Sequence, residues 1–202
     1  TAVEISENTS AMASSSTTIF GNLSVVGGSR VSSTTAIGTN NVTVISFNFT
    51  TTGEQMNITG INITFNGTFN ESDVVRVALY NSTRADAGVF NGTSAYDLIQ
   101  WNISTPVGGG GNTLRYNFSN IVLNVPVGSN TLLVVVNLSS SAAGGSTFNT
   151  SIEGAGDVVT TGGTSGLDIT ETFTTQRSSS ATMFGSLAVT GSSQVASYTR
   201  LG

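Results

Sequence analysis

The chain has 202 residues, a formal net charge of −5 and only 8% charged residues; it contains no Cys and no His, and its six basic residues are all Arg. Without Cys, His or Lys there can be no Ser-His-Asp triad, cysteine nucleophile, Schiff-base lysine or zinc site of His and Cys ligands. The negative charge and the lack of a basic cluster argue against nucleic acid as a partner. We therefore expect neither an enzyme nor a chain that binds a metal or a cofactor.

The first 38 residues are predicted to form an extended arm. Residues 19–26 alternate, so that Ile19, Gly21, Leu23 and Val25 share one face of a strand. The pair Gly27-Gly28 then predicts a turn before a second short strand near Val31.

Residues 39–176 are predicted to form an antiparallel immunoglobulin-like β-sandwich, so the fold class is all-β with extended β arms at both termini. Gly, Ser and Asn turns separate short apolar strands, and residues 126–129 (PVGS) are typical of a turn. A β-barrel is the alternative. The expected strands are 41–52, 55–65, 74–80, 96–103, 113–125, 130–138, 146–152, 158–160 and 167–173.

The two ends of the chain repeat each other. Residues 14–38 (SSSTTIFGNLSVVGGSRVSSTTAIG) and 178–202 (SSSATMFGSLAVTGSSQVASYTRLG) align without a gap at an offset of 164, with 14 of 25 positions identical. Residues 177–202 are therefore predicted to form strands like those of the N-terminal arm. Such a pattern indicates linear assembly, either as a tandem array or as a head-to-tail polymer of subunits with similar ends.

Asparagine is concentrated in glycosylation sequons, Asn-x-Ser/Thr, which account for 14 of the 19 asparagines. This density predicts an extracellular, cell-surface protein with covalent N-glycans on asparagines that point away from the core. No apolar run reaches the roughly 18 residues that a membrane span needs. The predicted sites are Asn8, Asn22, Asn41, Asn48, Asn57, Asn62, Asn66, Asn70, Asn81, Asn91, Asn102, Asn117, Asn137 and Asn149.

The carboxylates form two small groups, Glu71 with Asp73 and Asp157 with Asp168. A glycosidase needs two carboxylates about 5 to 10 Å apart in a cleft. The first pair lies in a polar turn beside the Asn70 sequon, where a glycan would block access. The same turn offers oxygen ligands for Ca²⁺, but its spacing does not match an EF-hand. We interpret this turn as solvated and expect no catalysis from these carboxylates.

Three segments carry a resemblance to known proteins: VVRVALYNST at 74–83, WNIS at 101–104 and VPVGSNTLLVVVNLSSSAAGG at 125–145. The chain resembles immunoglobulin-like domains of prokaryotic surface proteins and, with its many sequons and no Lys, looks like the thread-like surface filaments of archaea. That resemblance implies a helical homopolymer of identical subunits, joined by donor-strand complementation. Applied to this sequence, the donor strand would lie within residues 1–26, with candidates Val3, Ile5, Ile19, Gly21, Leu23 and Val25.

Alternatives remain at this stage. Both arms can instead fold back on their own domain, and the chain can be one repeat of a tandem S-layer or adhesin stalk. A further alternative is a carbohydrate-binding module, with Tyr96, Trp101 and Tyr116 as a stacking platform for sugars.

Overall fold

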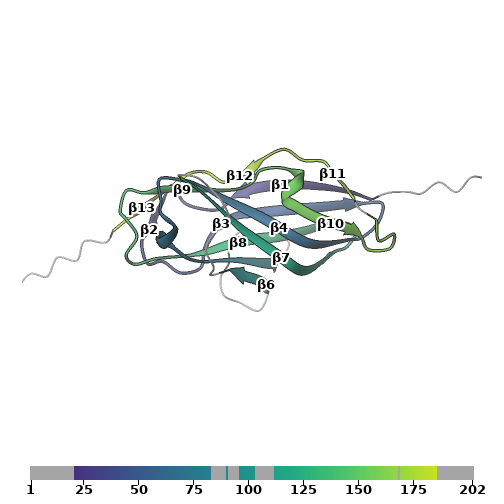
Figure 1. Cartoon of the computed structure of the whole chain (residues 1–202), viewed down its shortest axis with the longest axis horizontal. Helices are drawn as coiled ribbons and strands as arrows, with labels where there is room; N and C mark the ends of the chain where they lie inside the picture. Colours follow the sequence, from purple (N-terminus) through teal and green to yellow (C-terminus); the bar gives the residue numbers. More distant parts are fainter. Residues whose placement is uncertain (1–20, 83–89, 91–95, 103–111, 168, 186–202) are drawn as a thin grey trace, which may run out of the picture.

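The structure is a computed structural model that describes residues 21–82, 90, 96–102, 112–167 and 169–185. These residues form an antiparallel β-sandwich, with short 3₁₀ turns at Glu71–Asp73 and Ala155–Asp157 (Figure 1). The predicted all-β sandwich class is therefore confirmed.

The first sheet has six strands in the order β11-β1-β3-β8-β5-β6. Its neighbours are antiparallel except for β1 and β11, which run parallel. In that order the strands are β11 (Thr170–Glu171), β1 (Asn22–Ser29), β3 (Val42–Thr52), β8 (Gly128–Leu138), β5 (Val74–Ser82) and β6 (Tyr96–Asn102).

The second sheet follows the order β10-β4-β9-β13-β2, with β7 paired to β4 and β12 paired to β9. Only β13 and β2 pair in parallel in this sheet. The strands are β10 (Val158–Gly162), β4 (Met56–Gly67), β9 (Thr147–Ile152), β13 (Ala181–Phe184), β2 (Thr34–Ala36), β7 (Thr113–Val125) and β12 (Gln176–Arg177).

One large apolar cluster holds the two sheets together. Both sheets contribute phenylalanines, which make edge-on and tilted ring contacts at centroid separations of 5.3 to 6.5 Å. Because the described chain has few ion pairs and no disulfide, this buried apolar surface is its main source of stability. The fully buried phenylalanines are Phe47, Phe49, Phe65, Phe118 and Phe148.

Strand β1 belongs to this same core. Leu23 and Val25 are 0% and 2% exposed, whereas Val26 is 62% exposed, which confirms the predicted alternation. β1 pairs along its whole length with β3. At the other end of the chain, Met183 in β13 is also fully buried. The expected boundaries at residues 38 and 177 therefore do not separate packing units within the described chain.

The predicted turn at Gly27-Gly28 is wrong, because both glycines continue β1. The reason is a close approach of β12. The Gly27 N–H donates to Gln176 Oε1 at 2.8 Å, and a Cβ on Gly27 would lie only 2.9 Å from the Cβ of Gln176. The expected strand near Val31 is instead the short β2, three residues further on.

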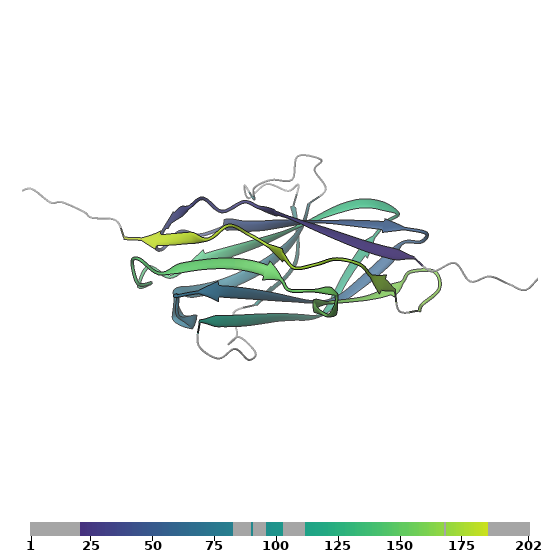
Figure 2. The same cartoon turned by 90° about the horizontal axis from the view of Figure 1, so that it is seen from above.

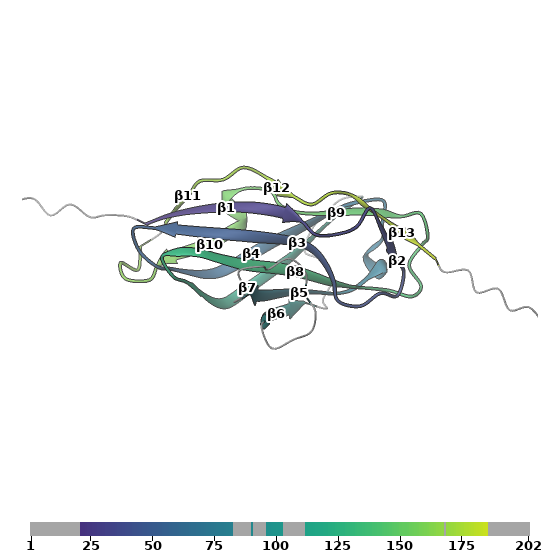
Figure 3. The same ribbon diagram turned by 180° about the vertical axis from the view of Figure 1, so that it is seen from behind.

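The sandwich is elongated, and the described chain begins and ends at opposite poles of its long axis (Figures 1, 2 and 3). The entry pole contains Gly21 and the loops 53–55, 126–127 and 163–169. The exit pole contains residues 36–38, the connection 139–146 and residues 184–185. The polypeptide thus crosses the domain from pole to pole.

Replacing Gly67 by Ala should destabilise the domain strongly. Gly67 has φ +155°, and an added Cβ would overlap the carbonyl oxygen of Thr147 and lie 2.8 Å from the Cα of Phe148. We expect a loss of about 3 kcal/mol or more in the free energy of unfolding, because backbone must move. The matched control is Gly128→Ala: its φ is +114° but nothing lies within 4 Å. This control should lose only about 1–2 kcal/mol in urea unfolding; equal losses would contradict the steric argument.

Candidate assembly surfaces at the two poles

At the entry pole, the carboxylate of Glu54 ties three parts of the chain together. It accepts hydrogen bonds from the backbone N–H groups of Thr164 and Ser165, each at 3.0 Å, and from the Ser165 hydroxyl at 2.7 Å. The bonds from Ser165, with smaller effects from Thr164 and the Gly21 N–H, hold the pKa of Glu54 below its ordinary value. Glu54 thereby joins the β3–β4 turn, the 163–169 loop and the start of β1.

Gly21 lies directly against this group. A Cβ placed on Gly21 would be 3.0 Å from Glu54 Cγ, 3.2 Å from Met56 Cε and 3.3 Å from Ile169 Cδ1. These are tight contacts, so the position accepts a side chain only if its neighbours shift. Two apolar side chains nearby remain open to solvent: Val127 is 62% exposed and Leu167 is 46% exposed.

At the exit pole, β13 inserts between β9 and β2. Backbone bonds from Ile37 N–H to Phe184 O (2.9 Å) and from Gly145 N–H to Met183 O (2.7 Å) extend the ladder to the pole. A Cβ on Gly185 would lie 3.8 Å from Ile37 Cδ1, an ordinary contact. Phe184 is 46% exposed here, so this pole also presents apolar surface.

The structure corrects part of the donor-strand prediction. Gly21 lies at the entry pole and Leu23 and Val25 lie in β1, where they complete the chain's own sheet and core. An edge of β3 within the same molecule is available without the entropy cost of association, so these residues pair internally. The candidates Val3, Ile5 and Ile19 lie outside the described residues.

The described sequon asparagines all reach the surface to some degree. Asn41, Asn48, Asn70 and Asn117 are exposed, and seven others are half-buried: Asn22, Asn57, Asn62, Asn66, Asn81, Asn137 and Asn149. The side chain of Asn102 is not described, and Asn8 and Asn91 lie outside the described residues. Sequons occur on strands of both sheets, whereas the loops 53–55, 126–127 and 163–169 of the entry pole contain none.

Some sequon amides are already engaged. Asn66 accepts a hydrogen bond from the Thr113 hydroxyl at 2.8 Å and donates through Nδ2 to Glu153 at 3.4 Å. The Oδ1 atom of Asn149 is buried without a hydrogen-bond partner. A glycan needs open space around the amide nitrogen, so the contacts at Asn66 and the burial at Asn149 disfavour one. Asn117 Nδ2 is also engaged, because it donates to Asn62 Oδ1 at 2.8 Å.

We therefore expect uneven glycosylation of the native protein. Glycopeptide mass spectrometry should find a glycan on the exposed Asn48, and none on Asn66 and Asn149. The Asn48→Gln variant should lose one glycan mass, whereas Asn66→Gln should leave the glycan mass unchanged. Full occupancy of Asn66 would contradict this reading of the amide geometry.

Two of the carboxylates considered from sequence, Asp73 and Asp157, hold local structure. Buried Asp157 pairs with Arg115 and accepts the Glu153 N–H at 2.9 Å, and Asp73 accepts the Asn70 N–H at 2.8 Å. Asp168 lies outside the described residues. Among the residues that the structure describes, no group of three or more acidic side chains could hold a metal ion.

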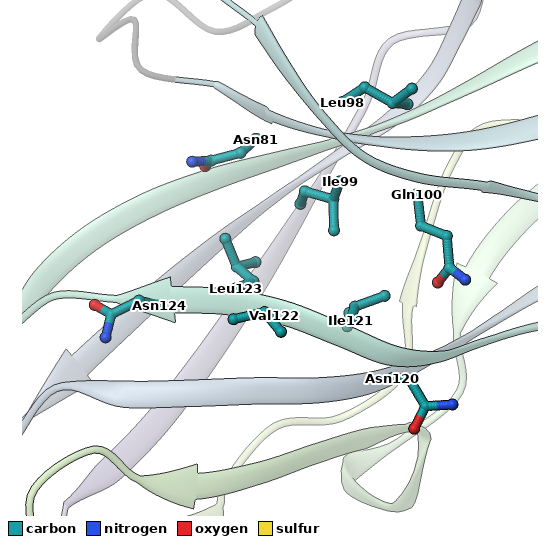
Figure 4. A pocket seen from close by; sticks show the side chains of 9 residues that line it. All are labelled: Asn81, Leu98, Ile99, Gln100, Asn120, Ile121, Val122, Leu123 and Asn124. Carbon is teal, nitrogen blue, oxygen red and sulfur yellow. The ribbon is translucent and has the colours of Figure 1, made fainter.

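A groove of about 540 Å³ opens between the edge strands β6 and β7 (Figure 4). Uncharged side chains line it, and the buried amide oxygens of Asn81 and Gln100 have no hydrogen-bond partner. Of the aromatic platform expected from sequence, Tyr116 is 3% exposed and packs on Phe65 in the core, so it does not face sugars. The side chains of Tyr96 and Trp101 are not described.

Sequence reasoning missed Glu54. It considered carboxylates only where they cluster, and Glu54 is isolated in the sequence. The available signal was the position of Glu54 in the predicted turn TTGEQM. Its partner Ser165 lies 111 residues away in the sequence and reaches this turn only in the folded chain.

No protein-family model and no curated protein matches the chain. Among solved structures, one of AvmM, which catalyses macrocyclization in alchivemycin A biosynthesis, matches with a TM-score of 0.44 and 10% identity, covering 82% of this chain and 91% of that chain. A structure of manganese lipoxygenase of Gaeumannomyces graminis, reported with partial zonadhesin of Komagataella pastoris, has a TM-score of 0.27 and 17% identity, covering 79% and 48%. At these TM-scores neither similarity carries an argument about function.

The described part of the chain contains no helix of sufficient length and apolarity to cross a membrane.

Acid should weaken the entry pole. Because the pKa of Glu54 is lowered in the fold, its contribution is complete above the ordinary value of 4.5 and is lost as the pH falls through the lowered value. Thermal melts should show a constant melting temperature from neutral pH to about pH 5 and a decline below about pH 4. Glu54→Gln should melt lower at neutral pH and decline less steeply in acid. The control Glu71→Gln, at an exposed carboxylate, should have the same melting temperatures as the unaltered chain across the pH range. If the two variants melt alike, Glu54 does not stabilise the entry pole.

Proposed function

We propose that this chain is one repeat, with the end of the preceding copy and the beginning of the next, of an extracellular N-glycosylated stalk built from β-sandwich domains joined end to end. The observation that carries the proposal is a match between sequence period and domain size. The sequence repeats at an offset of 164, and the strands of the domain, from the start of β1 at Asn22 to the end of β13 at Phe184, occupy 163 residues. Gly185, which follows, is the counterpart of Gly21 in the repeat.

The path of the chain supports this arrangement. It enters at one pole and leaves at the other (Figure 3), as a linear array of domains requires. In the repeat, residues 186–193 match β1 and residues 17–20 match β13. In a longer polypeptide, each copy would therefore have its own equivalents of β1 and β13, and these strands would complete that copy's own core.

The surface supports an extracellular setting. Most described sequons lie on strands such as β3, β4, β7 and β9, and charges are few. Asn41 and Asn70 lie in connections beside the exit pole, and Asn22 follows Gly21 at the start of β1. Glycans on the strands would surround a stalk while leaving the entry-pole loops, which lack sequons, open for contact with a neighbour.

The internal pairing of β1 favours the covalent stalk over the donor-strand polymer. In a donor-strand polymer the groove beside β3 would be filled by a neighbouring subunit. Here β1 of the same chain fills it, with Leu23 and Val25 buried. The domain therefore needs no partner to complete that edge.

The mass of the native polypeptide tests the proposal. After removal of glycans, a denaturing gel should show a polypeptide much larger than the 20.6 kDa of this chain. The recombinant 202-residue chain should be a folded monomer in dilute solution, by light scattering after size exclusion, because its core is complete. A native band near 20.6 kDa, together with polymers of the recombinant chain, would instead establish strand exchange.

A further inference from the structure

We propose that successive copies of this domain contact each other directly through their poles, with the exit pole of one copy packed on the entry pole of the next. This inference rests on the proposed stalk function and names its interface. The partner surface is a second copy of the same domain.

The first argument is the length of the connection. β13 ends at Phe184, and β1 begins at Asn22, which the repeat aligns with position 186. Only Gly185 therefore separates the last strand of one copy from the first strand of the next. Consecutive Cα atoms lie about 3.8 Å apart, so a single residue cannot hold two domains away from each other.

The second argument is that one glycine has two sets of neighbours. As the last described residue of one copy, Gly185 lies against Ile37, whose Cδ1 would be 3.8 Å from an added Cβ. As the counterpart of Gly21 in the next copy, the same glycine would lie against that copy's equivalents of Glu54 and Met56, whose Cγ and Cε atoms are 3.0 and 3.2 Å from a Cβ added to Gly21. The exit pole of the first copy and the entry pole of the second therefore meet at this residue.

The third argument is the chemistry of the two surfaces. Phe184 is 46% exposed at the exit pole, and Val127 and Leu167 are 62% and 46% exposed at the entry pole. Burial of such side chains against each other stabilises a contact. The Glu54 carboxylate at the entry pole is already satisfied by hydrogen bonds within its own copy.

The consequence is a stiff stalk. A glycine in an open linker leaves domains free to reorient, whereas the entry pole buries Gly21, the counterpart of this glycine. Because Glu54 accepts three hydrogen bonds from Thr164 and Ser165, the loops of the entry pole are held in place where the preceding domain would contact them.

A two-copy protein tests the interface. Residue 202 matches Gly38, so the 202-residue chain is extended from there with residues 39–202 to give two complete domains. The chain has no Cys, so Val75→Cys in each copy provides a unique pair of sites for spin labels at an exposed position. Double electron–electron resonance spectroscopy then measures the distribution of distances between the two labels, and so between the two domains.

We expect a narrow distribution. Inserting four Gly and Ser residues after Gly185 should make it roughly twice as broad, because the joint becomes a flexible linker. Phe184→Ser in the first copy should also broaden it. The matched control is Val122→Ser, which changes an 89% exposed apolar residue within β7, outside the loops assigned to the poles, and should leave the width unchanged.

The outcomes separate the interface from the stalk. If both copies fold, shown by twice the unfolding enthalpy of the single chain, but the distribution is as broad as with the insertion, the interface is overturned and the stalk remains. If the second copy does not fold, both proposals are overturned. A narrow distribution that responds to the insertion and to Phe184→Ser, and not to Val122→Ser, establishes the interface.

Discussion

The burial of β1 in its own domain is the interaction on which the remaining structure depends. Leu23 and Val25 fill the core from the edge of the first sheet, while β1 pairs with β3 along its length. This pairing places Gly21 at the entry pole and carries the chain toward β2 at the other end. A domain closed in this way is complete within one sequence period, so copies can follow one another along a polypeptide.

The chain reaches this stability with little help from charge or covalent crosslinks. Its described ion pairs, Arg115–Asp157 and Arg177–Glu153, each include an arginine on a strand of the second sheet. The pKa of Glu153 is lowered: burial opposes this, but hydrogen bonds from Ser151 and Arg177 outweigh it. The carboxylates of Glu54, Glu153 and Asp157 stabilise loops and strand ends locally. The apolar core between the sheets supplies the larger stabilisation.

Much of the strand pattern could be predicted from sequence because alternation of apolar and polar residues is a local property. The expected strands 113–125 and 146–152 lie within a residue of β7 and β9. The sequence-based predictions failed where contacts between residues far apart in the sequence determine the local structure. Gly27-Gly28 suggested a turn, but Gln176 packs against Gly27 and keeps β1 extended. Glu54 was overlooked because its partner Ser165 lies 111 residues away.

The sequence by itself determined the all-β character, the candidate glycosylation sites and the 164-residue period, since each is written in residue order and composition. Only the tertiary structure decided that Leu23 and Val25 serve their own core rather than a neighbour's. Strand alternation specifies which face is apolar, but it does not specify which strand edge that face will join. The choice of edge is made by long-range packing, and so is the placement of Gly21 and Gly185 at opposite poles.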